Sequence, residues 1–248
     1  DGRLVYFVSD DGAAGTMAER AVLDPRRAVE LPADADAVAI AAAMNPGMSS
    51  WVGLRRRAEL AAGESVLVLG ATGNAGRMAV QIAKLLGAGE VIAAGRNAEI
   101  LATLPALGAD RVVSLEAGEE ATAALAEAAA EVDVVVDYLW GKPAEAAIPS
   151  IVRARRDRAR ALRWVQIGAI TGPEIALPSA ALRACNLKLM GSGQGSVSTV
   201  GIVEELPALA REVGAGNLTI DADPVPLADV ETAWNAPIAP SHRLVFVP

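Results

Sequence analysis

Three glycines spaced three residues apart, Gly70, Gly73 and Gly76, form the pattern in this sequence with the clearest chemical meaning. They follow a continuous apolar run at residues 65–69 and precede a segment with helical periodicity. Glycines at a strand-to-helix turn let the backbone approach a pyrophosphate closely, and the N-terminus of the next helix attracts the phosphate charge. The spacing therefore predicts a dinucleotide site formed by the turn residues Gly70, Ala71, Thr72, Gly73, Asn74, Ala75 and Gly76.

The residues about 20 positions beyond these glycines indicate which dinucleotide binds. Sites for NAD usually place an Asp or Glu there, where its carboxylate binds the ribose 2′-hydroxyl. This chain instead has Gly95, Arg96 and Asn97. The guanidinium of Arg96 suits a 2′-phosphate, which predicts NADPH as the cofactor; an ordinary surface arginine is the alternative interpretation. Ile167 and Gly168, where the fifth predicted strand ends, complete the predicted cofactor-binding residues.

Strands and helices must alternate around this turn for the site to form. The predicted strands are residues 65–69, 91–94, 111–115, 132–136, 164–167 and 187–190, with a helix expected after each of the first four and after the sixth. This alternation predicts right-handed crossovers and an α/β fold with a doubly wound parallel sheet.

The two ends of the chain have a different pattern. Short strands are predicted there at residues 4–8, 17–23, 218–220 and 244–247. Two helices are predicted at residues 35–43 and 49–60, separated by Asn45-Pro46-Gly47, which typically breaks a helix. The shared strand character of the two ends predicts one discontinuous domain that flanks the dinucleotide-binding domain.

Composition excludes several classes of protein. The chain has 248 residues, a net charge of −8 and a hydrophobic fraction of 52%, which is typical of a globular protein without nucleic-acid or anionic-membrane partners. No apolar run approaches the roughly 18 residues of a membrane span. The single cysteine, Cys185, indicates a reducing, cytoplasmic location and is interpreted as a packing residue. Because Asp1 lies just before an apolar run, we expect further residues to precede it.

Several segments, taken in order, resemble the medium-chain dehydrogenase/reductase superfamily, and within it the zinc-free quinone oxidoreductase branch. They are GTMAE at residues 15–19, GESVLVLGATG at 63–73, AVQIAKLLGA at 79–88, LGAD at 107–110, and PLADV followed by AW at 226–234. The resemblance implies a Rossmann dinucleotide-binding domain at residues 36–217. It also implies a partial GroES-like, β-rich catalytic domain at residues 1–35 and 218–248, whose first part is absent from this chain. It further implies a homodimer formed through the edge strand from Leu187 to Met190.

The resemblance also implies an activity. NADPH would deliver a hydride to a quinone, an enone or a related carbonyl compound, a small electrophilic substrate. Ser49 matches a Thr or Ser that lies near the nicotinamide in the family, and Asn45 and Ser50 are expected beside it as positioning residues. The alternative is a non-catalytic NADPH-binding sensor or structural protein of the same fold.

The resemblance predicts no metal site. Zinc enzymes of the superfamily place a cysteine ligand where this chain reads Met44-Asn45-Pro46, and one cysteine with one histidine, His242, cannot form their tetrahedral site. His242 itself is interpreted as a solvated or hydrogen-bonded residue.

Two further patterns have a less specific meaning. Tyr138 and Lys142 have the Tyr-x-x-x-Lys spacing of short-chain dehydrogenases, but Tyr138 ends a predicted strand and Pro143 follows Lys142, so we disfavour that interpretation. The arginine-rich run from Arg153 to Arg163 is interpreted as a solvated basic helix end, with an anionic partner as the alternative.

Overall fold

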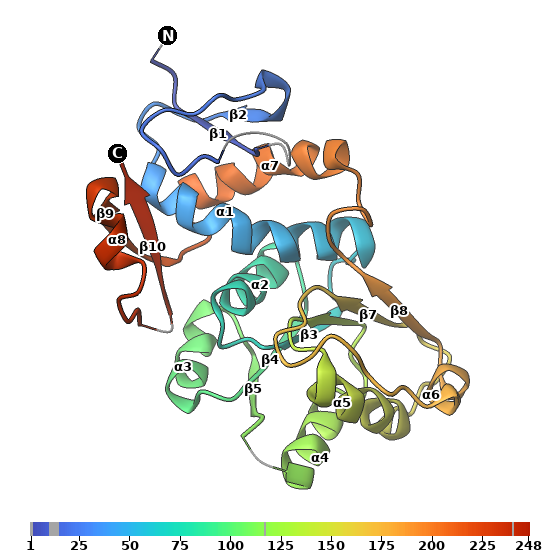
Figure 1. Ribbon diagram of the computed structural model, residues 1–248. Helices are drawn as coiled ribbons and strands as arrows, with labels where there is room; N and C mark the ends of the chain where they lie inside the picture. The colour runs from blue at the N-terminus through green and yellow to red at the C-terminus, as the bar shows by residue number, and fades with distance from the viewer. Residues whose placement is uncertain (1, 10–14, 117, 240) are drawn as a thin grey trace. The chain divides into compact units, whose positions relative to one another are not determined.

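A computed structural model describes residues 2–9, 15–116, 118–239 and 241–248 (Figure 1). The chain forms two compact units: the central unit, Ser49–Val197, and the terminal unit, which combines Asp1–Met48 with Ser198–Pro248. The two compact units divide after residues 48 and 197. The sequence predicts the domain boundaries elsewhere, after residues 35 and 217. Within the expected terminal segment 1–35, residues 1 and 10–14 lie outside the described part of the chain.

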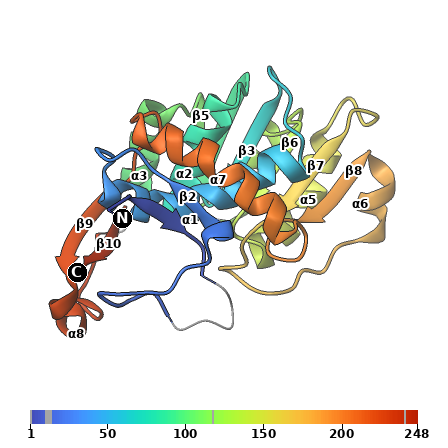
Figure 2. The ribbon, with the colours of Figure 1, turned by 90° about the horizontal axis from the view of Figure 1, so that it is seen from above.

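The central unit contains a six-stranded sheet in which every neighbouring pair of strands is parallel (Figure 2). The strand order is β5-β4-β3-β6-β7-β8. The strands are β3 (Ser65–Leu69), β4 (Glu90–Gly95), β5 (Arg111–Ser114), β6 (Val134–Asp137), β7 (Leu162–Gln166) and β8 (Leu187–Gly191). The order reverses between β3 and β6, as in a doubly wound α/β sheet. The predicted fold class is confirmed, with all six strands at the expected places.

Helices cover the sheet. Those of the central unit are α2 (Asn74–Leu85), α3 (Ala98–Thr103), α4 (Gly118–Ala128), α5 (Gly141–Ala154) and α6 (Ser179–Ala184), with a 3-10 helix at Leu104–Leu107. One buried cluster joins the apolar residues of α4, α5 and α6 to one face of the strands, with Trp164 and Ile148 among its fully buried members. The continuous apolar runs of β3 and β6 are buried throughout because parallel strands are covered on both faces.

One expectation about the helices is wrong. Asn45-Pro46-Gly47 does not separate two helices; α1 runs without interruption over Ala37–Val52 and continues as a π-helical turn over Gly53–Arg57. A proline inside a helix costs roughly 3 kcal/mol. Residues on both sides of Pro46, including Met44 and Trp51, are buried, and their burial outweighs the local penalty.

The terminal unit contains two small sheets. β1 (Val5–Phe7) pairs antiparallel with β2 (Ala28–Glu30), and β9 (Asp221–Pro226) pairs parallel with β10 (His242–Val247). The helices are α7 (Thr199–Gly214), which packs against β2, and α8 (Val230–Ala233), with 3-10 helices at Pro25–Arg27 and Leu227–Asp229. The predicted strands at residues 17–23 and 218–220 are wrong, because both segments are irregular and β9 begins only at Asp221.

No helix in the described part of the chain is both long enough and apolar enough to span a membrane.

Candidate active site

The carboxyl ends of the central strands lie in register. Leu69 of β3 pairs with Ala94 of β4 and with Asp137 of β6, and Asp137 pairs with Gln166 of β7. The residues that follow these strand ends therefore lie along one edge of the sheet. In open α/β sheets this edge binds ligands where the strand order reverses, which here is between β3 and β6.

The glycine turn after β3 has no room for a side chain at Gly76 and little room for one at Gly70. Gly70 has a φ of +87°, and its amide and that of Ala71 both donate to Ala94 O at 2.9 Å. A Cβ on Gly76 would lie 2.2 Å from Gly70 O, and one on Gly70 would lie 3.1 Å from Leu139 Cδ2. Gly73 is the N-cap of α2, and no side chain caps that helix within the described residues. The turn therefore forms a backbone cradle at an open helix N-terminus, which fits a pyrophosphate.

The end of β4 borders this cradle. A Cβ on Gly95 would lie 2.5 Å from Thr72 Cγ2, so a side chain at position 95 would displace Thr72 from the turn. Arg96 is exposed, and within the described residues it forms no hydrogen bond or ion pair. Asn97 caps α3, where its Oδ1 accepts from the Ile100 amide at 3.0 Å. Arg96 thus remains available to an anion, whereas the oxygen of Asn97 is already used in the fold.

The turn after β6 is held by a buried carboxylate. Oδ1 of Asp137 accepts from the amides of Leu139 (2.8 Å) and Trp140 (3.0 Å), and its Oδ2 accepts from Trp164 Nε1 (2.9 Å). Burial raises the pKa of Asp137, and these hydrogen bonds partly oppose that rise. Trp140 has a φ of +53°, a conformation that the two backbone hydrogen bonds to Asp137 help to hold.

The end of β7 packs against the same turn. The amides of Ile167 and Gly168 both donate to Asp137 O, at 2.8 and 3.1 Å. A Cβ on Gly168 would lie 2.8 Å from Tyr138 O. Position 168 therefore requires glycine for the close approach of two backbones. The structure places both predicted cofactor residues of β7 at the same sheet edge as the glycine turn.

A pair of hydroxyl groups meets beside this edge. Ser49 Oγ lies 3.0 Å from the phenol oxygen of Tyr138, and the hydroxyl of the fully buried Ser50 also hydrogen-bonds this phenol. Burial raises the pKa of Tyr138 to about 12, although the two serine hydrogen bonds lower it slightly. The phenol is therefore protonated at neutral pH and can act as a hydrogen-bond donor.

Tyr138 was missed as a partner of Ser49 by sequence reasoning. Its spacing from Lys142 draws attention to the wrong residue, because Lys142 Nζ pairs with Glu145 Oε1 at 2.7 Å. Tyr138 directly follows β6, the strand next to β3, and this position is the signal that could have identified it. The third positioning residue, Asn45, is exposed on α1, four residues before Ser49 and within the terminal unit; its role stays a prediction.

The described residues contain no group of three or more His, Cys, Asp and Glu side chains arranged to hold a metal ion. Cys185 is buried, which raises the pKa of its thiol. His242 Nδ1 contacts both carboxylate oxygens of Asp223 at 3.0 Å, between β10 and β9.

Comparison with known proteins agrees with this geometry. The family described as zinc-binding dehydrogenase matches residues 75–215. A probable NADPH-dependent quinone reductase of Emericella nidulans, TdiC, is 33% identical over 224 residues, which cover 86% of this chain and 62% of that protein. The chain thus spans less than two thirds of the length of this relative.

Solved structures show the same fold. AibC superposes with a TM-score of 0.77 at 23% identity, over 95% of this chain and 63% of that one. A thermostable alcohol dehydrogenase from Pyrobaculum aerophilum, solved with cobalt and zinc bound, has a TM-score of 0.70 at 29% identity, over 94% and 64% of the two chains. With the family match covering more than half of its residues, this chain belongs to the zinc-binding dehydrogenase family, within the medium-chain dehydrogenase/reductase superfamily.

Proposed function

We propose that this protein is an NADPH-dependent oxidoreductase that reduces quinones, enones or related carbonyl compounds without zinc. The observation that carries the proposal is the meeting, at one sheet edge, of a glycine turn closed to a side chain at Gly76 and a partly buried, protonated Tyr138 hydrogen-bonded to Ser49. The relative from Emericella nidulans, described as a probable NADPH-dependent quinone reductase, supports the same class of reaction.

The residues at this edge fit a dinucleotide. The cradle at Gly70–Gly76 would hold the pyrophosphate against the first amides of α2, and Arg96 would donate to the 2′-phosphate. Residues 95–97, at the end of β4, include no carboxylate to bind a 2′-hydroxyl or to repel that phosphate, which favours NADPH over NADH. When bound, the reduced nicotinamide supplies a hydride.

Reduction of a carbonyl or quinone places negative charge on the substrate oxygen. The phenol of Tyr138 stays protonated at neutral pH, and its hydrogen bond with Ser49 links the two hydroxyl groups in one network. We infer that Ser49 Oγ donates a hydrogen bond to the developing oxyanion and gives its proton to it, that the phenol of Tyr138 replaces this proton on Ser49, and that solvent then reprotonates Tyr138. In this role the network takes the place of a metal ion. The Met44-Asn45-Pro46 sequence, where zinc relatives have a cysteine, supports the zinc-free reading.

We further propose that the protein is a cytoplasmic homodimer, paired through β8 from Leu187 to Met190. This strand is the outer strand of the sheet on its side, and an unpaired edge can join a copy of itself.

The decisive experiment follows NADPH oxidation at 340 nm with a panel of quinones and enones, with and without a zinc chelator. We expect turnover that the chelator leaves unchanged, and little turnover with NADH. Ser49→Ala and Tyr138→Phe should lose most of this activity, whereas Tyr6→Phe, the same change at the other tyrosine of the chain, should retain it. Tight NADPH binding without turnover of any substrate would favour a cofactor sensor instead. Activity that the chelator removes would contradict the zinc-free mechanism.

A further inference from the structure

A cavity of about 530 Å³ lies at the amino edge of the central sheet, at the opposite strand ends from the glycine turn. It borders the segments that lead into β3, β6, β7 and β8. Its charged lining residues are Glu64, Asp133, Arg160, Arg163 and Lys188, and small residues such as Ala62 and Ala161 form the rest of its wall. The zinc-free reductase mechanism uses none of these residues.

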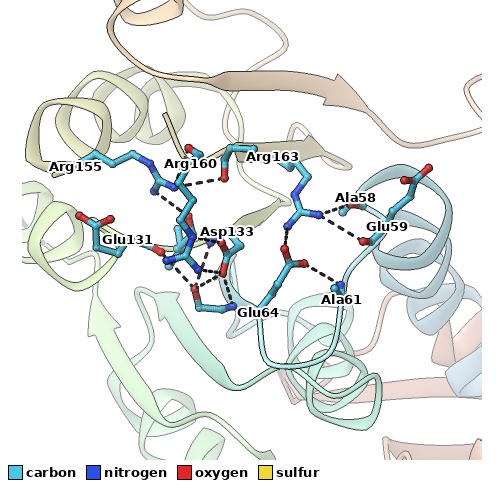
Figure 3. A network of polar contacts seen from close by, with 12 residues as sticks. Ala58, Glu59, Ala61, Glu64, Glu131, Asp133, Arg155, Arg160 and Arg163 are labelled. Atoms are coloured by element: carbon cyan, nitrogen blue, oxygen red, sulfur yellow. Dashed lines mark hydrogen bonds and ion pairs between the residues drawn. The ribbon is translucent and has the colours of Figure 1, made fainter. Parts of the chain in front are cut away.

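Each carboxylate oxygen of this cavity already has a hydrogen-bond partner (Figure 3). Asp133 is buried, and its Oδ2 accepts from the amide and the hydroxyl of Ser65, at 2.9 and 3.0 Å, while Arg160 spans both of its oxygens. Glu64 accepts from Arg163 Nη2 at one oxygen and from the Ala61 amide at the other, 2.8 Å away. These two carboxylates neutralise two of the three cations.

The cations, by contrast, keep donors to spare. Lys188 is exposed, and its ammonium group has no hydrogen-bond or ion-pair partner within the described residues. Nη1 of Arg160 likewise has no partner there, and the side chain is 45% exposed. In addition, Arg163 and Lys188 are register partners on β7 and β8, a placement of two like charges that costs stability. The cavity therefore has one net positive charge and an excess of donors over acceptors.

The buried side chain of Arg155 holds the backbone around Arg160 in place. Arg155 is 2% exposed, and its Nη1 donates to Ala130 O (3.0 Å) and Val132 O (2.9 Å). Its Nη2 reaches the carbonyls of Arg160 and Ala161, both of which line the cavity. The backbone that presents Arg160 is thus tied to the loop that presents Asp133. A ligand would meet donors that are already positioned, which lowers the entropy lost on binding.

We propose that this cavity binds a small organic anion, through a phosphate or carboxylate group that accepts from Lys188 Nζ and Arg160 Nη1. An acceptor-only group would satisfy these donors, which have no acceptor among the described residues. The volume lies in the range of ligand pockets, which leaves room for an organic group attached to the anion. The site is separate from the cofactor edge and does not depend on the proposed reductase activity, although Lys188 lies on β8, the strand proposed to pair in the dimer.

The test is an NMR titration of the full chain, labelled with 15N, at constant ionic strength. Pyrophosphate and citrate serve as probes for the phosphate and carboxylate sources, and sodium chloride is the reference. We expect saturable shifts of the amides of Glu64, Ala161 and Lys188 with at least one probe. The probe that binds more tightly identifies the anionic group.

Two variants locate the binding. Lys188→Gln should weaken it about 3- to 10-fold, because one charge-assisted hydrogen bond is lost at a partly exposed site. Lys142→Gln, at an exposed lysine that pairs with Glu145 elsewhere on the same unit, should leave the affinity unchanged. Arg96→Gln should also leave it unchanged, because Arg96 follows the carboxyl end of β4. Shifts confined to the glycine turn, equal affinity in Lys188→Gln, or no saturable shifts with either probe would overturn the proposal.

Discussion

Replacing Arg155 with methionine should destabilise the central unit much more than the same replacement at the exposed Arg153. Methionine keeps most of the aliphatic stem but removes the guanidinium that donates to four carbonyl oxygens. Two of these hydrogen bonds, to Ala130 and Val132, have good lengths of 3.0 and 2.9 Å, and the two of 3.3 and 3.4 Å are weak. The carbonyls of the loop before β6 would then lose their buried donor.

The magnitude follows from the two short bonds. A hydrogen bond from a charged donor contributes about 1.5–3 kcal/mol. Part of this is offset by the cost of burying the cation, whose Nε has no hydrogen-bond partner within the described residues. We therefore expect the free energy of unfolding to fall by about 2–4 kcal/mol, which corresponds to roughly 4–16 °C in Tm for a chain of this size.

The assay is urea unfolding monitored by circular dichroism, with thermal unfolding as a second measurement. Arg153→Met is the matched control, because Arg153 is exposed in the last turn of α5 and should change the free energy of unfolding by less than about 0.5 kcal/mol. If both variants lose the same small amount, Arg155 does not hold the two loops together, and the rigid wall of the cavity loses its support.

Three further predictions concern the cofactor edge. Arg96→Ala should weaken NADPH binding roughly 10- to 150-fold and leave NADH binding nearly unchanged. Both dissociation constants are measured by fluorescence, and equal weakening of both would make Arg96 a structural residue. Gly76→Ala should weaken binding of both cofactors by more than about tenfold, because its Cβ would lie 2.2 Å from Gly70 O. Gly214→Ala is the control and should leave binding unchanged, because a Cβ there meets open space. Unchanged binding in Gly76→Ala would show that the glycine turn does not hold the cofactor. Tyr138 has a pKa of about 12 in the folded state against 10.0 in the unfolded chain, so its stabilising contribution is complete below pH 10 and is lost as the pH rises from 10 to 12. The stability difference between the wild type and Tyr138→Phe should therefore shrink over that interval in denaturant unfolding, and a constant difference would contradict the raised pKa of the phenol.

Most of the central sheet could be predicted because its signals are local. Each strand is a short apolar run followed by a turn residue, and each helix is an amphipathic segment of ordinary length, so alternation alone fixes the class of fold. The same holds for the glycine turn, since Gly70 and Gly76 are required by a positive φ and by a close backbone contact. These requirements depend on residues that are neighbours in the sequence.

The rest depends on contacts between distant residues. The bond between Ser49 and Tyr138 joins positions 89 residues apart, and the pairing of Arg160 with Asp133 joins positions 27 apart. The interpretation of the arginine run as a solvated helix end is wrong for Arg155. α5 ends at Ala154, and the buried side chain of Arg155 donates to carbonyl oxygens of the loop before β6. No periodicity in the run itself distinguishes its buried member from the exposed ones.

The incorrect break at Pro46 has a chemical consequence. If the helix ended before Asn45, Ser49 would begin a new helix, and nothing would fix its orientation relative to the residues before it. In the uninterrupted α1, Asn45 and Ser49 are separated by four residues and therefore lie on the same side of one helix. The π-helical turn that follows holds Gly53 close to the end of β7, where a Cβ at position 53 would meet Ile167 Cδ1 at 3.1 Å. Within the central unit, the segment that follows Ser49 therefore packs against the end of β7 one turn later, which helps to hold the serine hydroxyl at Tyr138. Local rules predict that Pro46 breaks a helix, but Pro46 lies inside α1, the same helix that carries Ser49 of the proposed proton relay.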